Sequence, residues 1–132
     1  MYIKTLTAIT LCAASAIASA QAMTKAEYDA AKDRIEMNYK TAKKSCDSLK
    51  DNAKDICEVE AKGKEKVEKA ELEHKYKATL GNARKLEEVK ADTTYDLAKE
   101  KCEDQAGDAQ KVCKADAKAV HDRAVKAAKE KA

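Results

Sequence analysis

The sequence predicts an all-α fold made of two disulfide-stapled helical hairpins, with about four long helices in total. Three observations lead to this prediction. The 132 residues contain no proline and only three glycines, whereas sheets and barrels need many turns that use these residues. Apolar residues recur at the spacing of a helical face. A pair of cysteines separated by ten residues, with a turn signal midway, occurs twice.

Residues 1–22 have the layout of a secretory signal peptide. A lysine precedes an apolar run of about a dozen residues, and small residues follow at the expected cleavage site. We expect cleavage after Ala22, which leaves Met23 first, or after Ala20. The apolar run is shorter than the ~20 residues of a transmembrane helix. The mature chain, 23–132, is therefore expected in the periplasm, or secreted, without an integral membrane segment.

The mature chain resembles itself at an offset of 56 residues, so that about 25–80 and 81–132 form an internal repeat. The segments 39–61 and 95–117 share a tyrosine, two cysteines and an alanine at matching positions. A repeat of this length indicates a duplicated supersecondary unit. We therefore predict one all-helical mature domain that contains two copies of the same helical unit.

Turn signals divide this domain into its four helices. Asp51-Asn52 and Gly107-Asp108 lie midway between paired cysteines, and Gly81-Asn82 provides a third turn. Gly107 suits a left-handed residue just past a helix end, and Asn52 and Asp108 are expected as helix N-caps. The intervening segments are rich in Ala, Lys and Glu, which are strong helix formers. The expected helices cover about 24–50, 53–80, 83–106 and 109–130.

Apolar stripes indicate how these helices pack. The first helix carries one stripe, and the third helix repeats it; in the first helix it consists of Ile35, Tyr39, Ala42, Cys46 and Leu49. The two middle helices each carry two stripes, so we expect each to contact two neighbours. The outer helices then touch one neighbour each or close a bundle, which leaves a loose antiparallel bundle and an extended rod both open. After residue 22 only 15 residues are Val, Ile, Leu or Met, so no deep core or pocket is expected.

The four cysteines of the mature chain are expected to form the disulfides Cys46–Cys57 and Cys102–Cys113. Positions eleven apart in a continuous helix lie ~16 Å apart along the axis, whereas a disulfide needs Cα atoms within ~7 Å. The chain must therefore reverse between the cysteines, and the turn signals lie at that point. An even cysteine count after a secretory leader is typical of an oxidising compartment. Cys12 lies within the leader and is expected to leave with it.

Zinc binding and redox catalysis are the rival interpretations of these cysteines. Structural zinc sites usually place two cysteines about two to four residues apart, and disulfide oxidoreductases use a C-x-x-C pair. Ten residues separate the cysteines of each pair here. We therefore expect structural disulfides and no metal.

The other polar residues show no catalytic motif. His74 and His121 do not recur at the repeat offset and are expected as partly exposed helical residues. Ser45 and Ser48 lack a nucleophile motif, and the sequence has no glycine-rich phosphate loop, H-E-x-x-H or calcium loop. We predict no catalytic residue, no cofactor and no enzymatic activity. Contacts within the hairpins are expected from the tyrosines on apolar stripes, which are Tyr28, Tyr39, Tyr76 and Tyr95.

The balance of charge argues against nucleic acid and membranes as partners. Lys and Arg number 27 and Asp and Glu 24, so long-range attraction to phosphate is weak. A membrane-surface helix needs large apolar side chains on one face, and the C-terminal segment has mostly alanine there. The partners expected are periplasmic proteins, and the oligomeric state is left open.

The same residues resemble a known group of proteins. The leader, the two Y-x-x-A-K-x-x-C copies and the segment DNAKDICEVEAKGKEKVEKAELEHKYK are similar to short exported Ala-, Lys- and Glu-rich proteins of β-proteobacteria. Some of these are labelled TolA-like cell-envelope proteins, and the likeness covers nearly the whole mature chain. The resemblance implies a place in the cell envelope. We do not expect the envelope-bridging mechanism of TolA, because that label rests on composition.

Three functional hypotheses follow. The first is a non-enzymatic periplasmic helical protein with a structural, interaction or stress-related role in the cell envelope. The second is a small chaperone-like binding module, because the double apolar stripes can form a groove. The third is a protective hydrophilin, since the AKEKA-like ending is similar to late-embryogenesis-abundant repeats.

Overall fold

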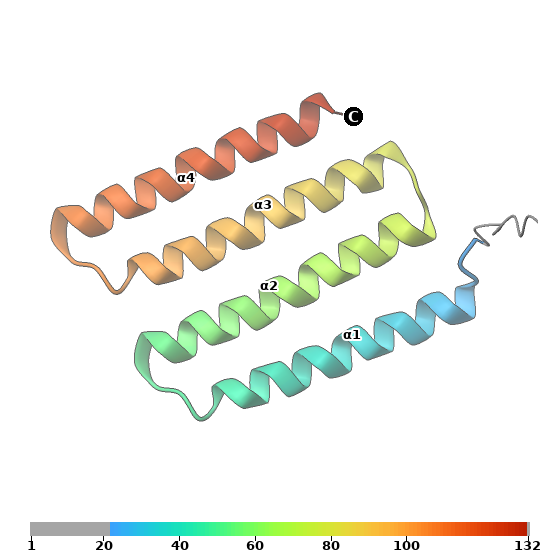
Figure 1. The fold of residues 1–132 in the computed structure, drawn as a ribbon, viewed down its shortest axis with the longest axis horizontal. Coiled ribbons are helices and arrows are strands. Elements are labelled where there is room, and N and C mark those ends of the chain that lie inside the picture. Colours follow the sequence, from blue (N-terminus) through green and yellow to red (C-terminus); the bar gives the residue numbers. More distant parts are fainter. Residues whose placement is uncertain (1–21, 132) are drawn as a thin grey trace, which may run out of the picture.

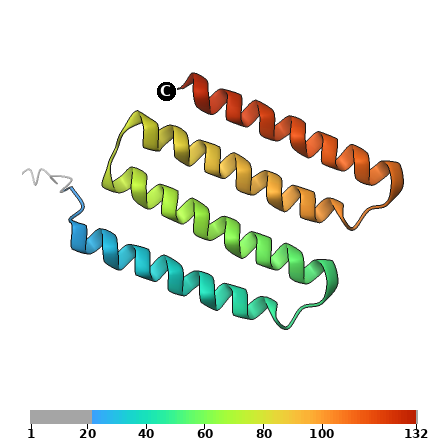
Figure 2. The ribbon, with the colours of Figure 1, turned by 180° about the vertical axis from the view of Figure 1, so that it is seen from behind.

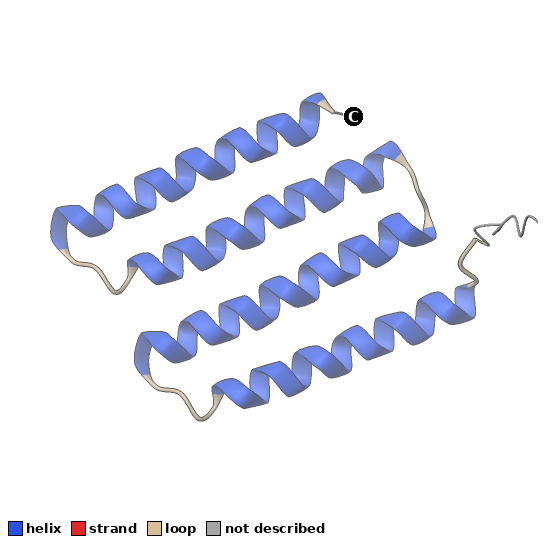
Figure 3. Ribbon diagram, viewed as in Figure 1, coloured by secondary structure: helices blue, strands red, loops and turns tan. Residues whose placement is uncertain are grey.

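The computed structural model describes residues 22–131 as four α-helices (Figure 1). This part of the chain contains no strand (Figure 3), so the all-α prediction is confirmed. The predicted leader, apart from Ala22, lies outside the described residues together with Cys12, and its cleavage stays a prediction. The helices are α1 (Lys25–Cys46), α2 (Asp51–Tyr76), α3 (Leu80–Cys102) and α4 (Gly107–Glu130).

Each helix packs only against its neighbours along the chain. Contacts join α1 to α2, α2 to α3 and α3 to α4, and α1 does not contact α4. The helices alternate in direction and lie side by side in one layer, as the front and back views show (Figure 1, Figure 2). The two hairpins are therefore neighbours in an antiparallel arrangement rather than parts of an extended rod. The outer helices touch one neighbour each, as one of the two sequence-based alternatives expected.

Both predicted disulfides are present. The Cα atoms of Cys46 and Cys57 lie 5.7 Å apart, and those of Cys102 and Cys113 lie 5.8 Å apart. Each bond joins the last residue of one helix to the first two turns of the next. The chain reverses between the cysteines of each pair, as the spacing argument required.

The two hairpins turn in the same way. The connections are residues 47–50 and 103–106. In each, the backbone N–H three residues after the cysteine donates to the cysteine carbonyl, at 3.0 Å in the first turn and 3.1 Å in the second. Because the helix stops at the cysteine, the predicted ranges 24–50 and 83–106 extend four residues too far.

The second helix of each hairpin opens with a left-handed residue. Asp51 has a φ of 50° and Gly107 a φ of 62°, and the repeat offset makes these two positions equivalent. The conformation predicted for Gly107 is confirmed, although Gly107 begins α4 instead of following a helix end. The predicted N-cap role of Asn52 and Asp108 is wrong. The N-cap positions are Lys50 and Ala106, and neither side chain makes a capping hydrogen bond.

Asn52 instead links the two hairpins. Its amide nitrogen Nδ2 donates to the Glu100 carbonyl at 3.1 Å and to Asp104 Oδ1 at 2.7 Å. Farther along the same interface α2 and α3 approach closely at Gly63, where an added Cβ would lie 3.3 Å from the Cβ of Thr93. A side chain at Gly63 would therefore press against α3.

The connection between the hairpins lies slightly before the predicted turn. Residues 77–79 join α2 to α3, and Gly81 and Asn82 belong to the first turn of α3. Thr79 is the N-cap, and its hydroxyl accepts from the Asn82 N–H at 3.1 Å. The Asn82 side chain donates to the Lys77 carbonyl at 2.8 Å. Asn82 thus helps to satisfy the end of α2 and the start of α3.

The buried interior is thin, as the composition predicted. The largest side chains that are wholly buried are those of Cys46 and Cys102, at 0% and 1% exposure. The other buried apolar residues in the described chain are Ala61, Leu72, Leu86, Ala91 and Ala128. Alanine removes little apolar surface from water, so helix packing contributes modestly here and the disulfides contribute a large share of the stability.

The outer helices, α1 and α4, carry an excess of basic residues. α1 and α4 each contain six Lys and Arg residues against four Asp and Glu residues. None of the four helices has an apolar stretch of the length needed to cross a membrane, within the residues described.

We expect the double variant Cys102→Ala/Cys113→Ala to lower the free energy of unfolding by about 3 kcal/mol, because a short closed loop restrains the unfolded chain. Cys46→Ala/Cys57→Ala should cost a similar amount, since both loops have a sequence separation of 11. Urea unfolding followed by circular dichroism measures both. An unchanged unfolding midpoint in either variant would contradict the stabilising role of that disulfide.

Replacing Asp51 by glycine should stabilise the protein by about 1 kcal/mol, because a side chain in the left-handed region carries a steric cost that glycine avoids. Gly107→Ala, at the equivalent position, should destabilise it by a similar amount. Thermal unfolding of both variants provides the measurement. A loss of stability in Asp51→Gly would show that the aspartate side chain has a compensating role.

Candidate functional site

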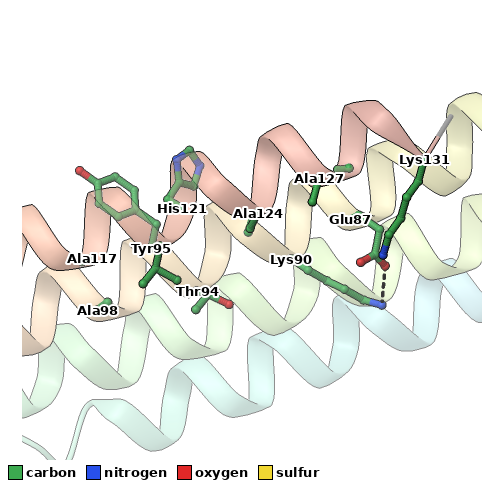
Figure 4. A pocket seen from close by; sticks show the side chains of 13 residues that line it. Glu87, Lys90, Thr94, Tyr95, Ala98, Ala117, His121, Ala124, Ala127 and Lys131 are labelled. Atoms are coloured by element: carbon green, nitrogen blue, oxygen red, sulfur yellow. Dashed lines mark hydrogen bonds and ion pairs between the residues drawn. The ribbon is translucent and has the colours of Figure 1, made fainter.

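A groove between α3 and α4 is the candidate binding site. It has a volume of about 400 Å³. Figure 4 shows its lining side chains projecting from both helices. Six of the thirteen lining residues are alanine, which makes the middle of the groove apolar and leaves space between the two helices. The lining alanines are Ala91, Ala98, Ala117, Ala124, Ala127 and Ala128.

The two ends of the groove differ in chemistry. One end is lined by Tyr95 and His121, and the other by Glu87, Lys90 and Lys131 (Figure 4). The ammonium of Lys90 lies 3.2 Å from a carboxylate oxygen of Glu87. The groove therefore runs from an aromatic end, over an alanine floor, to an end with two ammonium groups and one carboxylate.

The repeat offset explains why space exists at this place. Ala91 and Ala128 occupy the positions that Ile35 and Leu72 hold in the first hairpin. Leu72 is buried at 7% exposure, and so are both alanines, at 8% and 4%. Methyl groups at the positions of two large aliphatic side chains leave volume unfilled between the helices.

His121 bridges the two helices at the aromatic end. Its Nε2 lies 2.7 Å from Asp92 Oδ1 on α3, and its Nδ1 lies 3.5 Å from Asp122 on α4. The ring also stacks on Tyr95, with centroids 4.9 Å apart. The hydrogen bond to Asp92 raises the pKa of His121, with Asp122 adding to it and desolvation opposing it. The imidazolium form is thus favoured by its neighbours.

The first hairpin holds the opposite charge at the same place. Glu65 is equivalent to His121 and is only 6% exposed. Its two carboxylate oxygens lie 2.7 Å from the ammonium of Lys62 and 2.8 Å from that of Lys69. Lys69 in turn reaches Glu36 of α1 at 3.3 Å. Burial raises the pKa of Glu65, but the hydrogen bonds from the two lysines outweigh it and hold that pKa below its usual value.

The tyrosines make hairpin contacts, as predicted. Tyr28 of α1 stacks on Tyr76 of α2 with centroids 4.6 Å apart, and its hydroxyl donates to Glu73. This hydrogen bond raises the pKa of Tyr28. The ring of Tyr39 lies below the ammonium of Lys62, 4.8 Å from its centroid. Tyr95 stacks on His121, and all four tyrosines therefore contact the other helix of their hairpin.

The remaining residues considered in the sequence do not form a site. The hydroxyl of Ser45 donates to the Thr41 carbonyl at 3.1 Å, and that of Ser48 donates to the Ser45 carbonyl at 3.0 Å. His74 Nδ1 is buried and has no hydrogen-bond partner in the structure. Among the described residues, no group of three or more His, Cys, Asp and Glu side chains is arranged to hold a metal ion.

The sequence missed the role of His121. Its predicted partial exposure agrees with the observed 21% side-chain exposure, but its contact with Asp92 depends on the alignment of α3 against α4. The repeat offset did hold a signal for this role, because it makes Asp92 equivalent to Glu36 and His121 equivalent to Glu65. Asp92 and His121 connect the helices of the second hairpin directly, whereas Glu36 and Glu65 connect those of the first through Lys69.

We expect the protein to lose stability as the pH rises through the raised folded-state pKa of His121. The contribution is fully present below the unfolded-state value of about 6.5, where the ring is charged in both states and Asp92 favours the folded form. Asp92→Asn should lower the pKa of His121, as measured by NMR titration of the ring protons. An identical titration in wild type and Asp92→Asn would contradict this account.

Comparison with protein-family models, with curated proteins and with solved structures found no match to this chain.

Proposed function

We propose that this chain is a non-enzymatic helical protein of the cell envelope that acts by binding other molecules. The observation that carries the proposal is the open layer, in which each helix contacts only its chain neighbours. A domain usually buries its apolar faces between two layers. A single layer braced by disulfides instead keeps broad helical faces accessible for binding.

The chemistry of the polar residues also supports binding over catalysis. His121 is held by Asp92 and Asp122, and the hydroxyl of Tyr28 is bonded to Glu73. These groups connect helices within a hairpin, and the serine hydroxyls bond to nearby backbone carbonyls. A catalytic nucleophile needs a positioned base within hydrogen-bond reach, whereas these contacts stabilise the helical frame.

The disulfides support an oxidising compartment. Both pairs are formed, and such bonds persist in the periplasm or outside the cell and are rare in the cytosol. Together with the predicted leader, they favour export to the periplasm. The resemblance to exported Ala-, Lys- and Glu-rich envelope proteins favours the same location.

A chaperone-like role is the second candidate, because the groove between α3 and α4 is apolar and carries the exposed Val120. Short apolar segments of unfolded proteins are suitable occupants of such a surface. The two disulfides argue against a protective hydrophilin of the late-embryogenesis-abundant type. Protection of that kind does not need helices held in a fixed arrangement.

The proposal predicts specific neighbours in the cell. A photo-crosslinking residue at Val120, 51% exposed in the groove, should give discrete crosslinked products in intact periplasm, identified by mass spectrometry. The control position is Met37, 66% exposed on α1. Products that are the same at both positions would contradict a defined binding face, and turnover of a general hydrolase or reductase substrate panel would contradict a non-enzymatic role.

The same crosslinking separates the two candidates. A chaperone-like protein should crosslink many different proteins from Val120, and should suppress aggregation of a reduced client at near-stoichiometric ratio. A dedicated interaction protein should give few products and no suppression. Helical circular dichroism that is lost in dilute buffer would favour the hydrophilin instead.

A further inference from the structure

We propose that the groove between α3 and α4 binds one long-chain carboxylate, with its hydrocarbon chain on the alanine floor and its head group beside Lys90 and Lys131. This inference rests on the binding role proposed above and specifies a ligand class for it. The groove is lined on both sides by side chains of the second hairpin, and the ligand would lie between its two helices (Figure 4).

The dimensions of the groove fit one extended chain. Its lining on α3 runs from Glu87 to Ala98, which corresponds to a length of about 16 Å at the rise of an α-helix. The lining on α4 and its C-cap runs from Ala117 to Lys131, which corresponds to about 21 Å. The volume of about 400 Å³ over these two lengths gives a mean cross-section of about 19 to 25 Å². This area is close to the cross-section of one extended hydrocarbon chain. A docked helix, about 10–12 Å in diameter, would have several times that cross-section.

The charges along the groove orient the ligand. Lys90 and Lys131 supply two ammonium groups at one end, where the single carboxylate of Glu87 lines the groove. At the other end, Asp92 and Asp122 flank His121. The charges at this end offset one another, because Lys118 lies 2.6 Å from Asp122 and His121 lies 2.7 Å from Asp92. The lysine end has one more ammonium group than carboxylates and therefore attracts a carboxylate head group. The distal end of the chain would then contact Tyr95, whose ring offers apolar surface.

The comparison of the two hairpins indicates that the groove is specific to the second. Besides the change from Ile35 and Leu72 to alanine, Glu68 and Glu71 of the first hairpin correspond to Ala124 and Ala127. Two large aliphatic side chains and two carboxylates are therefore all replaced by alanine along the same strip. The replacements remove bulk and negative charge together, which is what an anionic chain ligand requires.

The cross-section of the groove also favours a free single-chain acid over a membrane phospholipid as the ligand. A groove with the cross-section of one chain accepts a free single-chain carboxylate. A diacyl phospholipid would have to place its second chain outside the groove, in water. We therefore infer a free acid and not a bilayer surface, and anionic vesicles serve as the opposing arm of the test.

The test measures binding of hexadecanoate to the oxidised protein by calorimetry, below the critical micelle concentration, and by displacement of fluorescent cis-parinarate. We expect saturable binding with one site per chain. Ala91→Ile/Ala128→Leu, which restores the residues of the first hairpin, should abolish it. Ala124→Glu/Ala127→Glu changes two exposed positions, and should abolish binding while leaving the circular dichroism spectrum unchanged.

The head-group contact has its own test. Lys90→Gln/Lys131→Gln should weaken hexadecanoate binding about fivefold, the magnitude expected for solvent-exposed ion pairs. The affinity for hexadecanol should stay the same. Met37→Ala on α1 is the matched control and should bind hexadecanoate as the wild type does.

Several results would overturn the inference. They are no saturable hexadecanoate binding, binding that survives Ala124→Glu/Ala127→Glu, and binding to phosphatidylglycerol vesicles without binding to the free acid. Capture of an amphipathic helical peptide in the groove, without carboxylate binding, would overturn it as well. In that last case discrete Val120 crosslinks would persist, so the proposed binding role would stand while the ligand class would be wrong.

Discussion

The disulfide at each hairpin turn is the constraint on which the rest of the structure depends. A helix in a single layer has neighbours only along its edges, so it buries little surface and gains little from packing. Cys46 and Cys102 are nevertheless almost wholly buried. Each disulfide closes its hairpin and fixes how the two helices align. That alignment brings Glu36 to Lys69 and Asp92 to His121.

The two copies of the hairpin share the features that form the fold and differ in the residues that line the candidate site. The two turns share a backbone pattern, with matching hydrogen bonds to the cysteine carbonyl and left-handed residues at Asp51 and Gly107. The positions between the helices differ instead. A buried Glu65 between two lysines corresponds to a histidine between two aspartates, and the aliphatic filling of the first hairpin corresponds to an open groove in the second. Such divergence between two hairpins that share their turns and disulfides is typical of a site placed on an existing scaffold.

The fold was largely predictable because its strongest signals are local. Cysteine spacing and helix propensity act within a few turns of chain, and the repeat shows the same pattern twice. Together they predicted the hairpins and both disulfides. The errors lie at the helix ends. Asn52 has the chemistry of an N-cap, but its side chain instead donates to the Glu100 carbonyl of α3 and to Asp104 in the turn that follows α3. No local pattern in the sequence records that competition.

The groove could not be predicted from composition, because it depends on which side chains are missing between two aligned helices. A low content of large apolar residues argues against a deep pocket, and the structure has none of the enclosed kind at this place. It does have a shallow channel, which small residues create by their size. The sequence indicates that channel when the two hairpins are aligned, because Ala91 and Ala128 then correspond to Ile35 and Leu72.

The excess of basic residues in the outer helices has a consequence for assembly. A row of repeated hairpins has no geometric end, and units of this kind can add head to tail into fibres unless their terminal surfaces prevent it. Here α1 and α4 carry charge of the same sign, so two copies that approach edge to edge repel each other. Raising the ionic strength screens this repulsion, so the outer edges of two copies approach each other more readily at high salt.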